Sequence, residues 1–218
     1  MTPNEIAFGD AARQQAPQDT QASQLGEQVP LVLPGYTWDQ YLSIEELFCS
    51  SRPRVRVKFL DGFLELMAPV SENHEERKSH LGCLLEAWCL DRGIRFFTRG
   101  NMTMTRPGRA GGEPDEAYCF GAKKEVSDLV IEVALTSGGL SKRAFYASFG
   151  VPEVWIWRRD HLEVFIWDAE AGNYEPSEES RVLPGLNLAL LEECSRMDCA
   201  SDAIREFRRR CGISATAE

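Results

Sequence analysis

The sequence predicts an α/β or α+β fold in which helices flank a mixed central sheet, and three observations support this fold class. Segments with strand-like alternation and segments with helical periodicity follow one another along the chain, as in a layered sandwich. Residues 128–134 are apolar on both faces apart from Asp128 and Glu132, as expected for a central strand. The chain has 218 residues, of which 43% are hydrophobic, so it can form one domain with a substantial core.

The first part of the chain combines a polar segment with a short helix. Residues 1–33 are rich in Gln, Ala, Pro and Ser. They can bury too little surface to offset the entropy of ordering, so we expect a flexible tail. Thr37 is a typical N-cap residue, and we expect a helix over Trp38–Phe48. The folded domain is expected at residues 34–195, followed by a C-terminal helix and tail at 196–218.

A hairpin and a long helix are expected next. Charged and apolar residues alternate over Arg54–Leu60, as in a half-exposed strand. The tight-turn pair Asp61-Gly62 then leads into a returning strand, Phe63–Met67, which completes a hairpin on the N-terminal side of the domain. Leucine and tryptophan recur at helical spacing over Asn73–Asp91, which indicates an amphipathic helix.

The rest of the chain mixes strands and helices. Further strands are expected at residues 102–106, 114–120, 128–134, 153–157 and 162–167, and further helices at residues 136–149 and 201–210. A Pro-Gly turn at 184–185 precedes an apolar stretch. No internal repeat is found. The order of the expected elements indicates an α/β or α+β sandwich with a mixed sheet.

Charge and cysteine usage restrict the function classes. Lys plus Arg number 24 and Asp plus Glu number 34, a net charge of −10. This balance argues against coating nucleic acid by bulk attraction but allows an enzyme with a local basic face. The seven cysteines form no C-x-x-C pair and no zinc spacing, which favours free thiols in a reducing cytoplasm. The sequence shows no signal segment and no apolar run near the roughly 20 residues that span a bilayer, so we expect a soluble cytoplasmic protein.

Asp115 and Glu132 are the strongest candidates for metal ligands. Glu132 stands between Ile131 and Val133 in the most apolar strand, and Asp115 follows Pro114 at the start of the preceding strand. A buried acid is costly unless it is paired or binds a metal. If the two strands are neighbours, the carboxylates converge and suit Mg²⁺ or Mn²⁺ with its waters. The alternative is a pair of structural acids bonded to arginine or to backbone amides.

Two further residues are candidates for catalytic roles. Lys142 follows the Glu132 strand near the start of a helix, and a helical side chain leans towards its own N-terminus. Its ammonium is therefore expected near Glu132, where it would stabilise developing charge or orient a water. His74, at the start of the long helix, would act as a proton shuttle or a phosphate contact. The alternatives are a solvated surface lysine and a capping or packed histidine.

Several spaced motifs resemble the Uma-two family of restriction-endonuclease-like proteins, over roughly Tyr36 to Leu190. They are Leu60-Asp61-Gly62, Met67-Ala68-Pro69, His74-Glu75, Glu113-Pro114-Asp115-Glu116-Ala117-Tyr118, Asp128-Leu129-Val130-Ile131-Glu132-Val133, Thr136-Ser137-Gly138-Gly139, Lys142, Tyr146 and Gly150-Val151-Pro152-Glu153-Val154-Trp155. The resemblance implies the PD-(D/E)XK nuclease fold, a divalent metal and DNA as substrate. It places the functional positions on Asp115 and Glu132, with Lys142 as the lysine.

The chain departs from the family pattern at three positions. The superfamily's usual lysine position, two residues after the acid, holds Ala134, so Lys142 would have to supply that charge from the helix. Lys58 stands where an acid is common just before the Asp-Gly turn, and Ser141 stands where an acid is expected. None of these changes removes a proposed metal ligand.

Three functions from different classes remain open on the sequence. The first is a metal-dependent endonuclease that hydrolyses DNA phosphodiester bonds with Mg²⁺ or Mn²⁺. The second is an inactive nuclease-fold relative that binds DNA or a protein. The third is an assembly module, in which the aromatic hairpin Val154–Trp167 forms the face of a homodimer.

Overall fold

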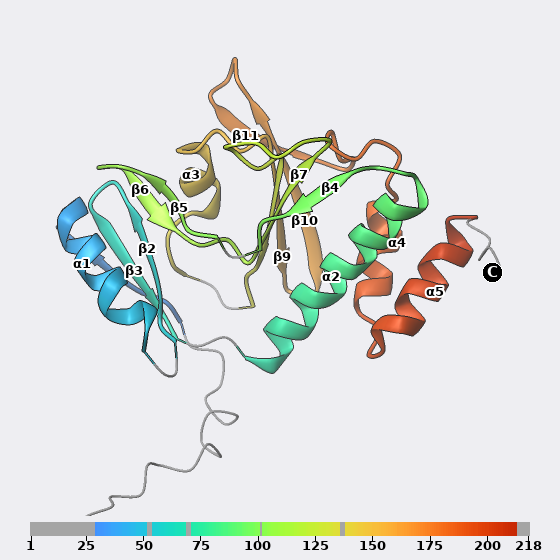
Figure 1. The fold of residues 1–218 in the computed structure, drawn as a ribbon, viewed down its shortest axis with the longest axis horizontal. Helices are drawn as coiled ribbons and strands as arrows, with labels where there is room; N and C mark the ends of the chain where they lie inside the picture. The colour runs from blue at the N-terminus through green and yellow to red at the C-terminus, as the bar shows by residue number, and fades with distance from the viewer. Residues whose placement is uncertain (1–28, 52–53, 69–70, 101, 136–137, 213–218) are drawn as a thin grey trace, which may run out of the picture.

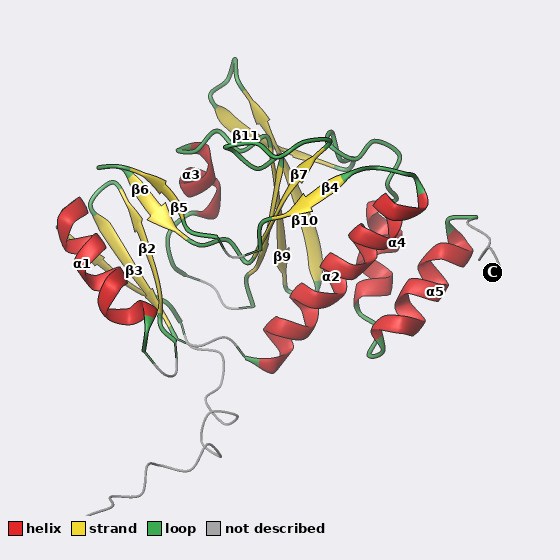
Figure 2. Cartoon of the chain, in the orientation of Figure 1, coloured by secondary structure: helices red, strands yellow, loops and turns green. Residues whose placement is uncertain are grey.

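A computed structural model describes residues 29–51, 54–68, 71–100, 102–135 and 138–212. These residues form two sheets and five helices (Figure 1, Figure 2). The smaller sheet has the strand order β1-β3-β2-β6-β5, and the larger has the order β11-β10-β9-β8-β7-β4. The α+β class is confirmed, because strands and helices alternate along the chain and pack in layers.

The smaller sheet is antiparallel at every pairing, with one helix packed against it. Its strands are β1 (Leu31–Pro34), β2 (Arg56–Leu60), β3 (Phe63–Met67), β5 (Met104–Arg106) and β6 (Ala110–Gly112). The predicted first helix is α1 (Trp38–Cys49), and the Thr37 side chain accepts a hydrogen bond from the backbone N–H of Gln40 at 3.3 Å. Because this cap satisfies a free N–H, α1 begins where its sequence predicts.

The larger sheet is mixed, as predicted. Its strands are β4 (Phe96–Thr98), β7 (Glu116–Phe120), β8 (Leu129–Val133), β9 (Glu153–Arg158), β10 (His161–Asp168) and β11 (Asn173–Ser177). β8 and β9 pair in parallel, and the other neighbours are antiparallel. α2 (Glu72–Asp91), α4 (Leu188–Ser195) and α5 (Ala200–Arg210) pack together on one face, and α3 (Lys142–Ala147) packs on the other (Figure 1).

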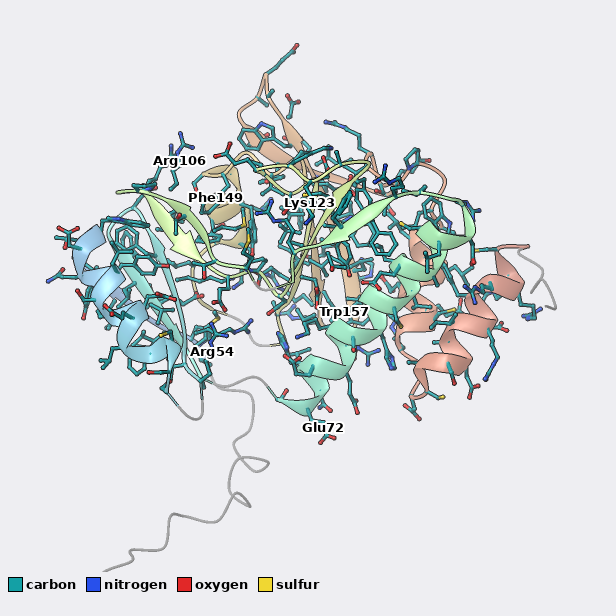
Figure 3. The ribbon with its side chains drawn as sticks, viewed as in Figure 1. Arg54, Glu72, Arg106, Lys123, Phe149 and Trp157 are labelled. Carbon is teal, nitrogen blue, oxygen red and sulfur yellow. The ribbon has the colours of Figure 1, made fainter. Side chains whose placement is uncertain are left out.

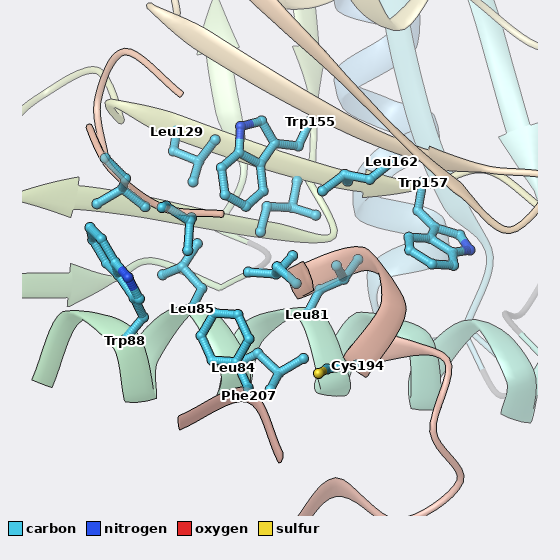
Figure 4. Close-up of a cluster of buried hydrophobic side chains, with 14 of the residues drawn as sticks. Leu81, Leu84, Leu85, Trp88, Leu129, Trp155, Trp157, Leu162, Cys194 and Phe207 are labelled. Atoms are coloured by element: carbon cyan, nitrogen blue, oxygen red, sulfur yellow. The ribbon is translucent and has the colours of Figure 1, made fainter. Parts of the chain in front are cut away.

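The alternation along β8 assigns each of its side chains to one of two cores. Leu129, Ile131 and Val133 face α2, where the leucines of that helix form the main core with Trp155 and Trp157 (Figure 4). Val130 and Glu132 alternate with them and face α3 and the smaller sheet. The space between the two sheets therefore receives the one acidic side chain of the central strand.

The predicted dimer hairpin is part of this core. Trp155 and Trp157 are both fully buried within the chain, so they offer no apolar face to a second subunit. The homodimer therefore gains no support from these tryptophans and stays a prediction.

Several elements have no clear sequence signal. β1, β4, β6, β11 and α4 were not expected, and β6 has the sequence Ala-Gly-Gly, which carries no strand pattern. The helix predicted over residues 136–149 is shorter, since α3 spans Lys142–Ala147. Gly138 and Gly139 have φ of 106° and 83°, which no helix accommodates. Residues 136 and 137 lie outside the described residues.

The charged face of β2 is turned inward, whereas the alternation predicted a half-exposed strand. Val57 and Phe59 face α1, and Lys58, between them, is buried on the opposite face. The strand prediction is right, but its exposed face is wrong. Acidic side chains that come from other elements supply Lys58 with partners, which the local pattern alone does not reveal.

The seven cysteines are all free thiols. Among the described residues, no helix is both long and apolar enough to cross a bilayer. Of the predicted tail, which spans residues 1–33, residues 1–28 lie outside the described residues. Leu31, Val32 and Leu33 at its end belong to β1 (Leu31–Pro34) and pair with β3. The last residues assigned to the tail thus belong to the folded part.

The pairing of β1 gives a stability prediction. A chain that begins at Val29 keeps β1, and a chain that begins at Tyr36 lacks it. We expect the melting temperature of the second to be lower by at least about 5 °C, because β3 loses four cross-strand partners and 1 kcal/mol corresponds to about 2–4 °C at this size. Thermal unfolding followed by circular dichroism measures both chains. Equal melting temperatures would show that β1 contributes no stability.

Candidate active site

Figure 3 draws the side chains of the described residues on the ribbon. A group of charged side chains, defined by its ion pairs, occupies part of the space between the two sheets. We call it the charge cluster. Its members come from five elements and the segment before β7: Arg56, Lys58, Glu65, His74, Asp115, Glu132, Lys142 and Tyr146. All four candidate residues of the sequence lie in it.

Glu132 is the centre of the cluster. The Lys58 ammonium of β2 donates to Glu132 Oε1 at 2.5 Å, and the Tyr146 hydroxyl of α3 donates to the same oxygen. Lys142 Nζ lies 3.3 Å from Glu132 Oε2. Because the Glu132 side chain is only 3% exposed, these three groups provide its stabilisation in place of water.

Asp115 lies beside Glu132 across the two strands. β7 and β8 are antiparallel with Glu116 opposite Ile131, so one step along the same register places Asp115 opposite Glu132. Asp115 Oδ2 accepts the backbone N–H of Val133 at 2.8 Å. The two acids therefore stand on neighbouring strands, which is the condition that the sequence interpretation set for their convergence.

The other contacts of Asp115 come from β2 and α2. Arg56 donates to Asp115 Oδ1, and His74 Nε2 lies 3.1 Å from Oδ2. Ser71 caps α2 by accepting the backbone N–H of His74, which fixes the imidazole at the first turn of the helix. His74 is buried and contacts Asp115 directly. It is thus a packed histidine, as the alternative interpretation stated, and it also lies within the site.

Glu65 is the third acid of the cluster. It pairs across β3 and β2 with Lys58, and its Oε1 lies 3.7 Å from Lys142 Nζ. Its Oε2 accepts the backbone N–H of Leu140. Oε1 has no hydrogen-bond partner among the described residues, so the cluster holds one buried oxygen with unused acceptor capacity.

The surroundings keep both central acids ionised. Burial favours the neutral form of Asp115, but the hydrogen bond from His74 and the charge of Arg56 outweigh it, so its pKa lies well below the ordinary value. Burial acts in the same direction on Glu132. The charges of Lys142 and Lys58 prevail there and lower the Glu132 pKa. Both groups are therefore carboxylates at neutral pH.

The same contacts change the pKa values of the donors. Complete burial lowers the pKa of Lys58 to about 8, although Glu132 opposes the change. The pKa of Lys142 is raised, because the attraction of Glu132 and Glu65 exceeds the effect of burial. Burial and the neighbouring Glu132 carboxylate raise the pKa of Tyr146. At pH 7 both ammonium groups are thus predominantly charged, and the Tyr146 hydroxyl is a hydrogen-bond donor.

Sequence reasoning missed four members of the cluster as site residues: Arg56, Lys58, Glu65 and Tyr146. Glu65 carries the same signal as Glu132, an acid flanked by apolar residues in a strand, and that signal was available. In the sequence, Lys58 stands out only as a departure from the family pattern. The burial of Arg56 and Lys58 depends on acids from distant segments, which alternation cannot predict.

The donor set suits a hard divalent ion in part. Two carboxylates at adjoining strand positions and Glu65 Oε1, which accepts no hydrogen bond among the described residues, are oxygen ligands of the kind that Mg²⁺ and Mn²⁺ prefer. However, no group of three or more His, Cys, Asp or Glu side chains in the described part of the chain is placed to hold a metal. Asp115 and Glu132 would therefore hold such an ion with water as the other ligands.

Comparison with known proteins is consistent with this geometry. Residues 38–198 match the Uma2 (Uma-two) family, described as "Putative restriction endonuclease". The match spans most of the chain and includes every member of the charge cluster. No curated protein matches the chain.

The contacts of Asp115 predict how stability depends on pH. Because the folded-state pKa of Asp115 is depressed, its contribution is fully present above the unfolded pKa. That contribution is lost as pH falls below about 4. Asp115→Asn should lower the free energy of unfolding by about 3–5 kcal/mol at pH 7, since it leaves Arg56 without its counter-charge. The variant should then lose less stability than the wild type on acidification.

Urea unfolding between pH 3 and pH 7 measures this difference. Asp202→Asn is a matched control, because Asp202 is exposed and its carboxylate pairs with Arg205 on its own helix, outside the charge cluster. It should keep the wild-type pH profile. Parallel profiles for Asp115→Asn and the wild type would show that Asp115 makes no pH-dependent contribution.

Proposed function

The chain belongs to the Uma2 family, and we propose that it is a metal-dependent endonuclease that hydrolyses phosphodiester bonds in DNA. Family membership indicates nuclease function. The observation that carries the proposal is the convergence of Asp115, Glu132 and Lys142, with Asp115 opposite Glu132 and Lys142 Nζ 3.3 Å from Glu132. Two acids can hold the metal of a metal-assisted phosphodiester hydrolysis, and a lysine beside them can stabilise the charge that develops.

The acids and the lysine have separate roles in this proposal. Asp115 and Glu132 would hold Mg²⁺ or Mn²⁺, which when bound would lower the pKa of a water and neutralise charge on the phosphodiester. Lys142 places a fixed positive charge beside Glu132, where it would stabilise the charge that develops on the phosphate oxygens. His74 Nε2 contacts the Asp115 carboxylate and thereby fixes its orientation. The imidazole would act as a proton shuttle.

DNA would approach from the side of Arg56 and Lys142. Their side chains are 18% and 14% exposed, whereas those of Lys58, Asp115 and Glu132 are almost fully buried. A guanidinium binds phosphate through paired hydrogen bonds. These two residues would therefore supply positive charge to a DNA phosphate on a chain whose net charge is −10.

A second candidate function is favoured by one contact. Lys58 donates to Glu132 at 2.5 Å in a buried ion pair, and this pair satisfies the acid without a metal. A nuclease fold stabilised in this way would bind DNA, through Arg56 and Lys142, without cleaving it. The cleavage experiment below separates the two functions.

The proposed location is the cytoplasm. All seven cysteines are free, and they range from buried Cys89 to exposed Cys49 and Cys199. Thiols of this kind persist where the compartment is reducing. Magnesium is also abundant there, as the proposed reaction requires.

The proposal predicts metal-dependent cleavage that depends on Lys142. Incubation of plasmid DNA with the protein and Mg²⁺ or Mn²⁺ should produce nicked and linear forms, and EDTA should abolish them. Lys142→Ala should reduce the rate at least about 100-fold, the size typical for loss of one transition-state contact. Lys142→Arg should rescue little, because a planar fork does not replace a compact ammonium.

Arg143→Ala is the matched control for this experiment. Arg143 adjoins Lys142 in α3 but is exposed and packs over the Phe165 ring, so its loss should leave cleavage unchanged. Circular dichroism confirms that each variant is folded. DNA binding without cleavage under every metal condition would reject the endonuclease and support the second function.

A further inference from the structure

We propose that Lys58 is a built-in counter-ion of Glu132 that competes with the divalent ion, so that metal binds only as the Lys58 ammonium leaves Glu132. This inference rests on the proposed metal site and adds a control that the chain itself carries. It concerns the affinity for the metal rather than the cleavage step.

Each carboxylate oxygen of Glu132 already faces a lysine ammonium group. Oε1 accepts from the Lys58 ammonium at 2.5 Å, and Oε2 lies 3.3 Å from Lys142 Nζ. A divalent ion that uses Glu132 as a ligand needs one of these oxygens. Lys142 is partly exposed and also faces Glu65, whereas Lys58 is 1% exposed and its ammonium donates to Oε1.

The fold provides a fitted position for the Lys58 side chain. A Cβ at Gly112 would come within 2.7 Å of Lys58 Cγ, so the glycine is required for the lysine stem to pass. The Lys58 ammonium lies 5.3 Å from the centre of the Phe145 ring and 5.8 Å from that of Tyr146. Aromatic faces attract a buried cation at this range. Lys58 therefore lies in a site shaped for an ammonium group.

The carboxylates and cations of the charge cluster balance one another without a metal. The cluster contains three carboxylates, of Glu65, Asp115 and Glu132, and three cations, of Arg56, Lys58 and Lys142. These charges sum to zero without a metal. A divalent ion would add two positive charges beside Lys58 in a buried space, where like charges repel strongly. Metal affinity is therefore opposed by the ammonium that already neutralises Glu132.

Glu65 offers a second position for the Lys58 ammonium when a metal displaces it from Glu132. Lys58 and Glu65 are directly paired across β2 and β3, and side chains of such a pair lie on the same face. Glu65 Oε1 is buried and has no hydrogen-bond partner among the described residues. A change in the Lys58 side chain would therefore exchange Glu132 for Glu65, whose Oε1 also lies 3.7 Å from Lys142 Nζ, without exposing the charge to water.

Metal binding tests the competition directly. We would titrate Mn²⁺ into the full-length protein and follow free Mn²⁺ by electron paramagnetic resonance. Lys58→Met removes the ammonium but keeps an unbranched stem, and we expect it to bind Mn²⁺ at least tenfold more tightly than the wild type. Lys58→Gln, a polar replacement, should show the same gain if Lys58→Met fails to fold.

Two control variants test whether the gain in Mn²⁺ affinity comes from the Lys58–Glu132 pair. Lys124→Met removes a lysine that pairs with Asp128 outside the cluster, changes the net charge equally, and should leave the affinity at the wild-type value. Glu132→Gln in the Lys58→Met background should abolish the gain. Equal affinity of the wild type and both Lys58 variants, or absence of binding in all of them, would overturn the proposal.

The result is separable from the proposed function. Tighter Mn²⁺ binding by the Lys58 variants without any DNA cleavage would support the competition and reject the endonuclease. Cleavage by a wild type whose Mn²⁺ affinity equals that of the variants would do the reverse.

Discussion

The burial of two ionised acids between two sheets is the constraint on which the rest of the structure depends. Asp115 and Glu132 lie in the space enclosed by the smaller sheet, the larger sheet and α3. A carboxylate in such a place needs partners whose interaction free energy offsets the hydration free energy that it loses on burial. Three neighbouring elements contribute them: β2 supplies Arg56 and Lys58, α2 supplies His74, and α3 supplies Lys142.

The same constraint explains features that are otherwise unconnected. β2 turns its charged face inward because the acids are there, and α1 then covers its apolar face through Tyr41 and Phe59. Gly112 lies where the Lys58 stem passes. The cap of α2 by Ser71 brings His74 to Asp115. The charge cluster thus links the two sheets, and it is also where the proposed chemistry takes place.

The sequence predicted the larger part of the fold and the centre of the site. Periodicity located α1, α2 and the central strand, and the apolar neighbours of Glu132 marked it as exceptional. The four candidate residues came together because strand adjacency and helix direction follow simple rules. What the sequence did not predict depends on long-range pairing. Short strands such as Ala110–Gly112 exist only because a neighbour pairs with them, and the burial of Lys58 requires an acid 74 positions away.

A double-mutant cycle between Lys58 and Glu132 tests most directly whether the cluster acts as one unit. The free energies of unfolding of the wild type, Lys58→Met, Glu132→Gln and the double variant would be measured by urea denaturation. Each single change leaves a buried charge without its partner, and the double change removes both. We predict that the double variant loses at least about 2 kcal/mol less free energy of unfolding than the two single variants lose together. Additive losses would contradict the account, because they would mean that Lys58 and Glu132 do not stabilise each other.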